Sequence, residues 1–298
     1  GIPAGRGPTS RYPVPATRYA GEAGHWWDEA VAYEVYVRSF ADSKGDGIGD
    51  LGGITERLPY LADLGIDVIW LTPFYPSPQA DFGYDVADHT DVDPTHGSLA
   101  DFDELVARAH DLGLRVMVDL VPNHTSSEHR WFRSAIDEGV DSPFRDHYVW
   151  RDPAPDGGPP NNWLSIFGGR AWTFDEASGQ YYMHLFLPEQ PDLNWAEPAV
   201  GEAFAEILRF WLDRGADGFR IDVAHSLTED PSFADNPPSP DLPPGVEPTE
   251  FDHLEHLHDL DQASNVDVYR SWRPIADEAN AFLLGEVYLS EPERVWRY

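Results

Sequence analysis

Residues 115–121 (RVMVDLV), followed by Pro122, Asn123 and His124, form the stretch that decides the fold. The run is short, apolar and rich in valine, which is typical of a buried strand in a parallel sheet. Its polar groups gather at its carboxyl end. The stretch therefore predicts a strand that ends in functional side chains.

Four other segments are predicted to be strands, and helical patterns separate them. We expect strands at residues 31–40, 68–72, 218–223 and 282–287, and helices at residues 54–64, 98–112, 200–214 and 266–279. Gly65 and Gly113 follow two of the helical patterns and suit a helix C-terminus. Strands that alternate with helices predict a parallel α/β sheet, either closed into a barrel or doubly wound.

The positions of the polar residues favour the barrel. Polar or charged groups lie at or just beyond the ends of several strands, namely Asp85, Asp119, Asn123, His124, Arg220, Asp222 and Glu286. In a closed barrel the carboxyl ends of all strands meet at one mouth, where the active sites of such enzymes lie. We therefore expect a TIM-type (β/α)8 barrel architecture.

The chain is expected to divide into a tail, two barrel segments and an insert. Residues 1–24, rich in Gly, Pro, Ala and Arg, predict a flexible tail. Residues 25–122 and 199–298 predict the barrel, the latter with strands four and five and the start of the following helix. Residues 123–198 contain many aromatic residues and little helical pattern, which predicts an irregular subdomain inserted after strand three. A long Pro-rich loop is expected at about 229–250.

Composition and charge restrict the classes of function. With 298 residues, 41% of them hydrophobic, the chain can bury a large core. It has no cysteine, which excludes disulfides and thiolate chemistry and fits a reducing, cytoplasmic compartment. Its net charge of −33 argues against nucleic acids and anionic membranes as partners. No apolar run approaches the ~18 residues that a membrane span needs. A small neutral substrate is expected.

Four motifs occur in order along the chain: DLVPNH at 119–124, QPDLN at 190–194, GFRIDV at 218–223 and GEV at 285–287. Together they resemble the signature regions of the α-amylase superfamily of glycoside hydrolases. The QPDLN motif is similar to one that marks the oligo-1,6-glucosidase and α-glucosidase branch. The resemblance runs from about Trp26 to the last residue. It implies a retaining, exo-acting α-glucosidase that releases terminal α-1,4- or α-1,6-linked glucose from short oligosaccharides or disaccharides.

Asp222 and Glu286 suit the two carboxyl roles of this chemistry. Retaining hydrolysis needs one carboxylate to attack and one carboxylic acid to protonate the leaving oxygen, about 5–5.5 Å apart. Arg220 lies two residues before Asp222 on the same strand face, so it is expected to hold Asp222 ionised as the nucleophile. Burial and the charge of Asp222 are expected to raise the pKa of Glu286, the acid/base. The alternative is a purely structural Arg220–Asp222 ion pair.

The resemblance also implies which residues hold the reacting glucose. Asp85 and His124 would bind its hydroxyls, Tyr84 would stack on its face, and Arg220 would join Asp85 and His124 in holding this sugar. For Asp85 the alternative is an ordinary turn residue, and for His124 a buried structural histidine. The Tyr-Asp and Asn-His pairs in which these residues occur favour binding.

The leaving-group side of the site is expected to include Phe167 and His225. In this branch the residue after the nucleophile follows linkage preference. Val223 favours α-1,6-linked substrates, whereas the Ala224-His225 pair that follows departs from the oligo-1,6-glucosidase pattern. Both linkages therefore stay open.

The loop at residues 42–50 (DSKGDGIGD) carries three acidic residues, Asp42, Asp46 and Asp50. Carboxylate oxygens suit hard cations, and the resemblance implies a structural Ca²⁺ or Mg²⁺ here, with Ile48 as a further ligand. Lys44 stands where the family has Asn, so its ammonium group is an alternative to the metal. The chemistry itself needs no cofactor.

The superfamily has a third catalytic carboxylate, an Asp preceded by His after the seventh strand. This chain has no matching position, because it ends at Tyr298, after the predicted fifth strand. We therefore expect a truncated barrel that needs its remaining part as a partner and is inactive alone. Two other functions stay open: a glucosyl-transferring isomerase of the trehalose or sucrose type, and a non-catalytic homologue.

Overall fold

The computed structural model describes residues 24–289 and 291–298. The tail predicted at residues 1–24 therefore lies, apart from Gly24, outside the described residues. Among the helices that are described, none combines the length and the apolar character of a membrane span.

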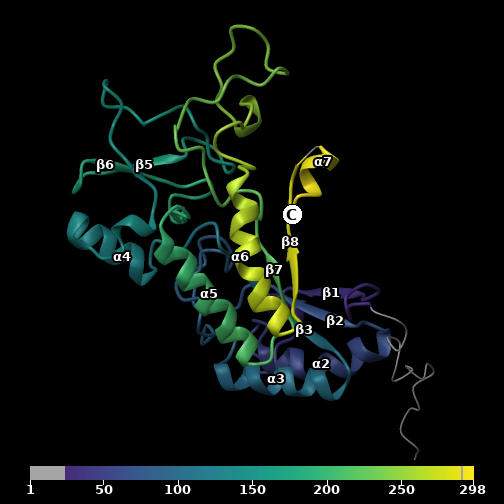
Figure 1. The fold of residues 1–298 in the computed structure, drawn as a ribbon. Coiled ribbons are helices and arrows are strands. Elements are labelled where there is room, and N and C mark those ends of the chain that lie inside the picture. Colours follow the sequence, from purple (N-terminus) through teal and green to yellow (C-terminus); the bar gives the residue numbers. More distant parts are fainter. Residues whose placement is uncertain (1–23, 290) are drawn as a thin grey trace, which may run out of the picture.

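The largest sheet of the molecule has five parallel strands (Figure 1). From one edge of the sheet to the other, the strands occur in the same order as in the chain. Every pairing between them is parallel. A doubly wound sheet would reverse its strand order, whereas a barrel wall does not. The prediction of a parallel α/β sheet is confirmed. The strands are β1 (Ala32–Val35), β2 (Val68–Leu71), β3 (Arg115–Leu120), β7 (Gly218–Ile221) and β8 (Phe282–Gly285).

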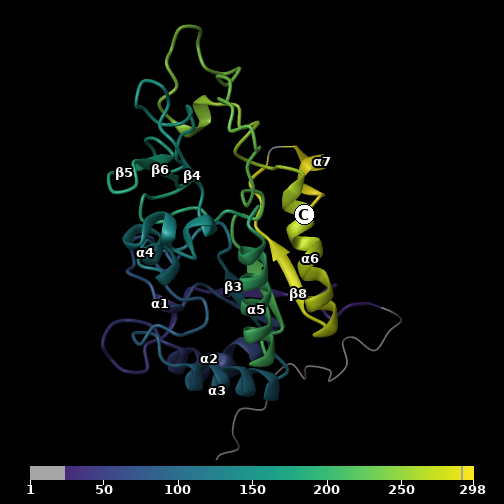
Figure 2. The ribbon, with the colours of Figure 1, turned by 60° about the vertical axis from the view of Figure 1, so that its left-hand side comes forward.

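Long helices connect successive strands and run alongside the sheet (Figures 1 and 2). Asp50 and Ser98 cap two of these helices, because their side chains accept hydrogen bonds from backbone N–H groups of the first turn. The largest buried apolar cluster joins the sheet to the connecting helices. These helices are α2 (Leu51–Leu64), α3 (Leu99–Asp111), α5 (Pro198–Asp213) and α6 (Ser264–Glu278).

Two short helices stand outside this pattern. Helix α1 (Val37–Phe40) follows β1 directly, so the strand predicted at 31–40 ends early, at Val35. Helix α7 (Pro292–Val295) lies near the C-terminus.

The segment between β3 and α5 is more regular than the predicted irregular subdomain. It contains α4 (Arg130–Asp137), the 3-10 turns η1 (Gly139–Asp141) and η2 (Arg145–His147), and an antiparallel sheet in the order β4-β6-β5. Some of its apolar residues form a separate small core around Trp163 and Trp172, and others, such as Phe132, join the main core. Helix α4 has only eight residues, too few for a clear helical period in the sequence. The strands are β4 (Trp150–Arg151), β5 (Trp172–Asp175) and β6 (Gln180–Met183).

A second excursion, residues 222–263, leads from β7 to α6. It contains one 3-10 turn, η3 (Phe251–His253), and otherwise irregular backbone. Figure 2 shows it beside the β4–β6 segment, beyond the end of the sheet to which β8 points. Hydrogen bonds from Asn162 and Trp163 to this excursion join the two segments. These two segments thus lie together over the carboxyl ends of the strands.

Candidate active site

A cleft of about 580 Å³ opens where the two excursions meet the carboxyl ends of the strands. Most of the sequence-predicted site residues line it, and they come from distant parts of the chain. The predicted residues in its wall are Tyr84, His124, Phe167, Arg220, Asp222, Val223, His225 and Glu286.

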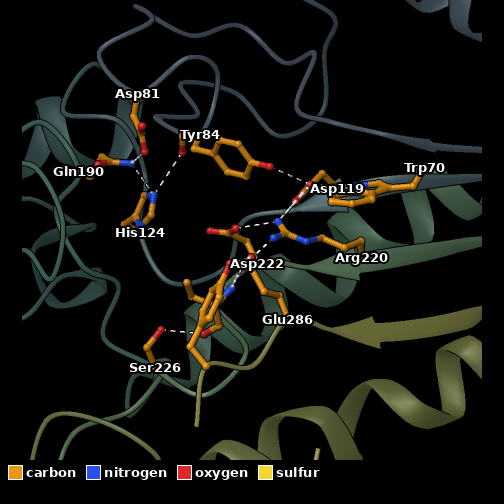
Figure 3. Close-up of polar contacts among 12 residues, drawn as sticks. Trp70, Asp81, Tyr84, Asp119, His124, Gln190, Arg220, Asp222, Ser226 and Glu286 are labelled. Atoms are coloured by element: carbon orange, nitrogen blue, oxygen red, sulfur yellow. Dashed lines mark hydrogen bonds and ion pairs between the residues drawn. The ribbon is translucent and has the colours of Figure 1, made fainter. Parts of the chain in front are cut away.

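Arg220 is the centre of a buried ionic cluster (Figure 3). Its Nη1 lies 3.0 Å from Asp119 Oδ1 and 2.7 Å from Asp222 Oδ1, and its Nη2 lies 2.6 Å from Glu286 Oε2. The register of β3 and β7 places Asp119 directly beside Arg220. Trp70 donates a 3.0 Å hydrogen bond to Asp119, and its ring lies 4.9 Å from the guanidinium carbon. Three carboxyl groups thus share one guanidinium.

The charge balance of this cluster differs from the sequence prediction. Burial, followed by the negative charge of Asp119, raises the pKa of Asp222 well above its ordinary value despite Arg220. Burial also raises the pKa of Asp119 to about 7. The prediction that Arg220 holds Asp222 ionised is therefore wrong for the substrate-free site. One guanidinium cannot balance three carboxylates, so the cluster retains a proton near neutral pH.

The pKa of Glu286 also differs from the predicted one. Burial favours its neutral form, but hydrogen bonds from the Tyr288 hydroxyl (2.8 Å) and the Val223 N–H (3.1 Å), with the charge of Arg220, hold its pKa below the ordinary value. The predicted rise is thus wrong for the substrate-free site. Sequence reasoning missed Tyr288, which lines the cleft two residues after Glu286.

Val223 explains how Asp222 and Glu286 come to face one another. It has a φ of 38°, a left-handed conformation that is rare and costly for a β-branched residue. The chain therefore turns sharply after Asp222. The turn directs the Val223 N–H toward Glu286 Oε2, and the Ala224 N–H toward the Glu286 carbonyl oxygen at 2.8 Å.

Asp85 does not line the cleft, so its predicted sugar-binding role is wrong. Its buried carboxylate accepts hydrogen bonds from Ser77 Oγ and from the backbone N–H groups of Ala80 and Asp81, at 2.8–3.0 Å. Asp85 therefore holds the loop together. Asp81 lines the cleft instead, and its Oδ2 accepts a 2.9 Å hydrogen bond from Gln190.

His124 lies beside Asp81 and Gln190 (Figure 3). Burial lowers the pKa of His124 to about 3, so the imidazole is neutral and can exchange hydrogen bonds with hydroxyl groups. Its Nε2 lies 2.9 Å from Gln190 Nε2 and 3.2 Å from the Tyr84 carbonyl oxygen. Sequence reasoning quoted the motif that begins with Gln190 but assigned the residue no role.

The remaining predicted cleft residues lie among aromatic neighbours. Phe167 is 54% exposed and meets Phe186 edge to face. Phe186 also lies against His124, with ring centroids 5.3 Å apart. The His225 ring lies 6.4 Å from that of Tyr288.

The loop at residues 42–50 does not gather its acidic residues around one point. Asp42 accepts hydrogen bonds from three backbone N–H groups, Asp46 accepts one from the N–H of Ile48, and Asp50 caps α2. In the part of the chain that the structure describes, no three His, Asp or Glu side chains are placed as metal ligands. With Lys44 in place, the three predicted carboxylate ligands are thus held by hydrogen bonds within the loop and are not gathered around a cation. Lys44 Nζ donates to the carbonyl oxygens of Thr95 (3.1 Å) and Pro94 (3.4 Å).

We propose that Lys44 ties this loop in place of a metal ion. EDTA is therefore expected to leave the melting temperature unchanged. Lys44→Asn is expected to lower the melting temperature and to make it rise when Ca²⁺ is added, because an amide oxygen is a Ca²⁺ ligand and an ammonium is not. Thermal unfolding with and without Ca²⁺ measures both effects. A fall in the wild-type melting temperature with EDTA would show that the loop holds a metal.

Comparison with known proteins agrees with this geometry. Residues 34–298 match the family model "Alpha amylase, catalytic domain", and the chain belongs to this family of glycoside hydrolases. It is 49% identical over 269 residues to a probable alpha-glucosidase of Rhizobium meliloti (strain 1021), a match that covers 88% of the chain and 48% of the relative. It is 53% identical over 212 residues to trehalose-6-phosphate hydrolase of Escherichia coli (strain K12), covering 71% and 38%.

A solved structure shows the same fold. The crystal structure of the alpha-glucosyl transfer enzyme XgtA superposes with a TM-score of 0.86 at 45% identity and covers 90% of this chain. The match covers 51% of that enzyme. The chain thus spans at most about half the length of these three relatives. The predicted family is confirmed.

Proposed function

We propose that this chain carries the amino-terminal part of a retaining α-glucosidase, with Asp222 as the nucleophile and Glu286 as the acid/base. The observation that supports this most strongly is that both carboxyl groups contact the same guanidinium, Arg220, from the ends of adjacent strands. They therefore lie close together, as retention requires. Both also line the cleft.

The reaction follows from these positions. Asp222 attacks the anomeric carbon while the proton of Glu286 passes to the glycosidic oxygen. The bond to the leaving sugar breaks and a glucosyl ester forms on Asp222. Glu286 then takes a proton from water, which cleaves the ester and restores the α configuration. The cluster retains the proton that the first step uses. Because Glu286 is the more acidic group in the free site, substrate binding must bring this proton to it.

The reacting glucose fits the side of the cleft that carries Asp81 and His124, which the buried Gln190 side chain contacts from within. These groups supply hydrogen-bond partners for hydroxyls, and neutral His124 does so without a charge. The ring of Tyr84 lies on the same wall, with its hydroxyl group 3.4 Å from Asp119 Oδ2. One side of the cleft therefore offers a polar surface for a single sugar.

The charges of the cleft favour a neutral substrate. Among its described lining residues Arg220 is the one Lys or Arg, and its guanidinium already serves three carboxyl groups. Asp252 adds a further carboxylate to the wall. A phosphorylated substrate, as the name of the Escherichia coli relative describes, would meet repulsion here. We therefore favour α-1,4- or α-1,6-linked disaccharides and short oligosaccharides, and Val223 favours the α-1,6 linkage.

We also infer that the site needs further polypeptide. Strands β1 and β8 form the two outer edges of the sheet, and outer edges of barrel strands are normally paired. Leu284 on β8 and Tyr288 beyond it are 41% and 72% exposed. A remaining barrel part would cover these groups and supply the third carboxylate of the family. Residues 1–298 alone are therefore expected to be inactive.

Product analysis with the full-length protein tests the proposed activity. Maltose, isomaltose, sucrose and trehalose-6-phosphate are supplied separately, and NMR follows the anomeric protons. We expect α-glucose as the first product from maltose or isomaltose and a much slower reaction with trehalose-6-phosphate. Preference for the phosphorylated sugar would overturn the neutral-substrate proposal. Conversion of sucrose into an isomer would favour a transferase, and no turnover at all would favour a non-catalytic homologue.

A further inference from the structure

The excursion between β7 and α6 connects these two elements and also supplies side chains that line the cleft. We call residues 229–261 the mouth loop. From it, Phe251, Asp252 and Leu260 line the cleft. We propose that Phe251 is a specificity-determining residue that stacks on the leaving group, and that His256 positions it. This inference rests on the proposed glucosidase function.

Phe251 packs near the acid/base, where we expect the leaving group to bind. It packs against an apolar cluster that includes Val223, Phe186 and Leu260. The N–H of Val223 contacts the carboxylate of Glu286, which is the group that protonates the leaving oxygen. The apolar cluster thus adjoins the acid/base. Aromatic faces near such a position bind the apolar face of a ring.

The imidazole of His256 packs against the ring of Phe251. The two rings are stacked with centroids 3.7 Å apart and an interplanar angle of 19°. The imidazole is held at both nitrogens, because Nε2 lies 3.0 Å from the Phe251 carbonyl oxygen and Nδ1 lies 2.9 Å from Asp259 Oδ2. Asp259 is only 1% exposed. The chain of contacts from Asp259 through His256 therefore restricts the orientation of the Phe251 ring.

The mouth loop is itself fixed to the segment between β3 and α5. The buried Asn236 side chain accepts hydrogen bonds from the N–H groups of Leu257 (3.0 Å) and His258 (3.1 Å). The backbone of Asn236 exchanges two hydrogen bonds with the side chain of Asn162, at 2.8 and 2.9 Å. Long irregular loops are usually mobile or functional. Here one buried amide ties both arms of the loop to its neighbour, so that Phe251 is presented on a pre-organised wall.

The test compares substrates that share the reacting glucose and differ in the leaving group. Phe251→Ala and His256→Ala are made in the full-length protein, with Glu247→Ala as the control. Glu247 lies on the same loop, is exposed and does not line the cleft. The substrates are maltose, isomaltose and α-glucosyl fluoride, whose fluoride has no ring to stack.

Phe251→Ala is expected to raise KM for maltose and isomaltose about tenfold, the effect of one aromatic contact, with little change in kcat. His256→Ala is expected to produce the same pattern to a smaller extent. Both variants keep their kcat/KM on α-glucosyl fluoride, and Glu247→Ala behaves as wild type on all substrates. An equal loss on the fluoride would mean that Phe251 and His256 are merely structural. Unchanged KM for the disaccharides would also overturn the proposal. A wild-type protein inactive on all three substrates would instead refute the glucosidase function.

Discussion

Asp222→Ala in the full-length protein is expected to lower kcat on maltose on the order of 10⁴-fold or more, because loss of a covalent nucleophile costs hydrolases at least this much. The buried carboxylate of Asp222 lies 2.7 Å from Arg220 and lines the cleft. Glu286, which contacts the same guanidinium, cannot replace the nucleophile because it protonates the leaving oxygen. Steady-state kinetics measures the loss.

Added azide tests whether the role lost in this variant is that of the nucleophile. In Asp222→Ala, azide can enter the space of the lost carboxylate and attack the anomeric carbon from the same side, which forms β-glucosyl azide. The exposed Asp213→Ala on α5 is the matched control and is expected to keep wild-type activity. Formation of α-glucosyl azide, or a small loss of kcat, would contradict the nucleophile assignment.

The second large effect is expected for Glu286→Gln. General acid catalysis contributes about 10²–10⁴-fold, so hydrolysis of maltose should fall by roughly this factor. Fluoride leaves without protonation, so the first step with α-glucosyl fluoride should be affected much less. Pre-steady-state kinetics separates this first step from the later hydrolysis of the ester, which also uses Glu286.

The exposed Glu278→Gln on α6 is the control for this variant and should leave both rates unchanged. Arg220, Tyr288 and Val223 stabilise ionised Glu286, so melting curves should confirm that the variant remains folded. An equal fall in the first step for maltose and for the fluoride would exclude Glu286 as the acid.

The regular framework was predictable because local patterns determine it. The valine-rich run at 115–121 and the helical patterns around 54–64 and 98–112 each appear close to the expected residues. The strand expected at 31–40 was too long, because a short apolar segment does not show where β1 ends and α1 begins. The eight-residue α4 was missed for a similar reason.

The difference between Asp81 and Asp85 could not be predicted from spacing alone. Between them Phe82 and Gly83 both have positive φ, of 50° and 108°. This turn directs Asp81 toward the cleft, whereas Asp85 is buried under its own loop. Backbone turns of this kind decide which of two nearby carboxylates meets a ligand, and the pattern of residue types does not reveal them.

The charge balance of the site depends on contacts between distant residues. The sequence shows Arg220 and Asp222 as neighbours on one strand, which suggests an ionised nucleophile. The strand register adds Asp119 as a second carboxyl group on the same guanidinium. Tyr288 and the strained Val223 then stabilise ionised Glu286. Asp222 therefore has a raised pKa and Glu286 a lowered one, the reverse of the prediction. Only the three-dimensional arrangement shows this.

The central claim, that Asp222 becomes covalently glucosylated, is tested most directly by trapping the intermediate. The full-length protein is treated with 5-fluoro-α-glucosyl fluoride, whose ring fluorine slows hydrolysis of the glucosyl ester. Peptic peptides are then analysed by mass spectrometry. We predict one added 5-fluoroglucosyl group, located on Asp222. A label on a different carboxylate, or turnover of maltose to β-glucose without any label, would contradict the account.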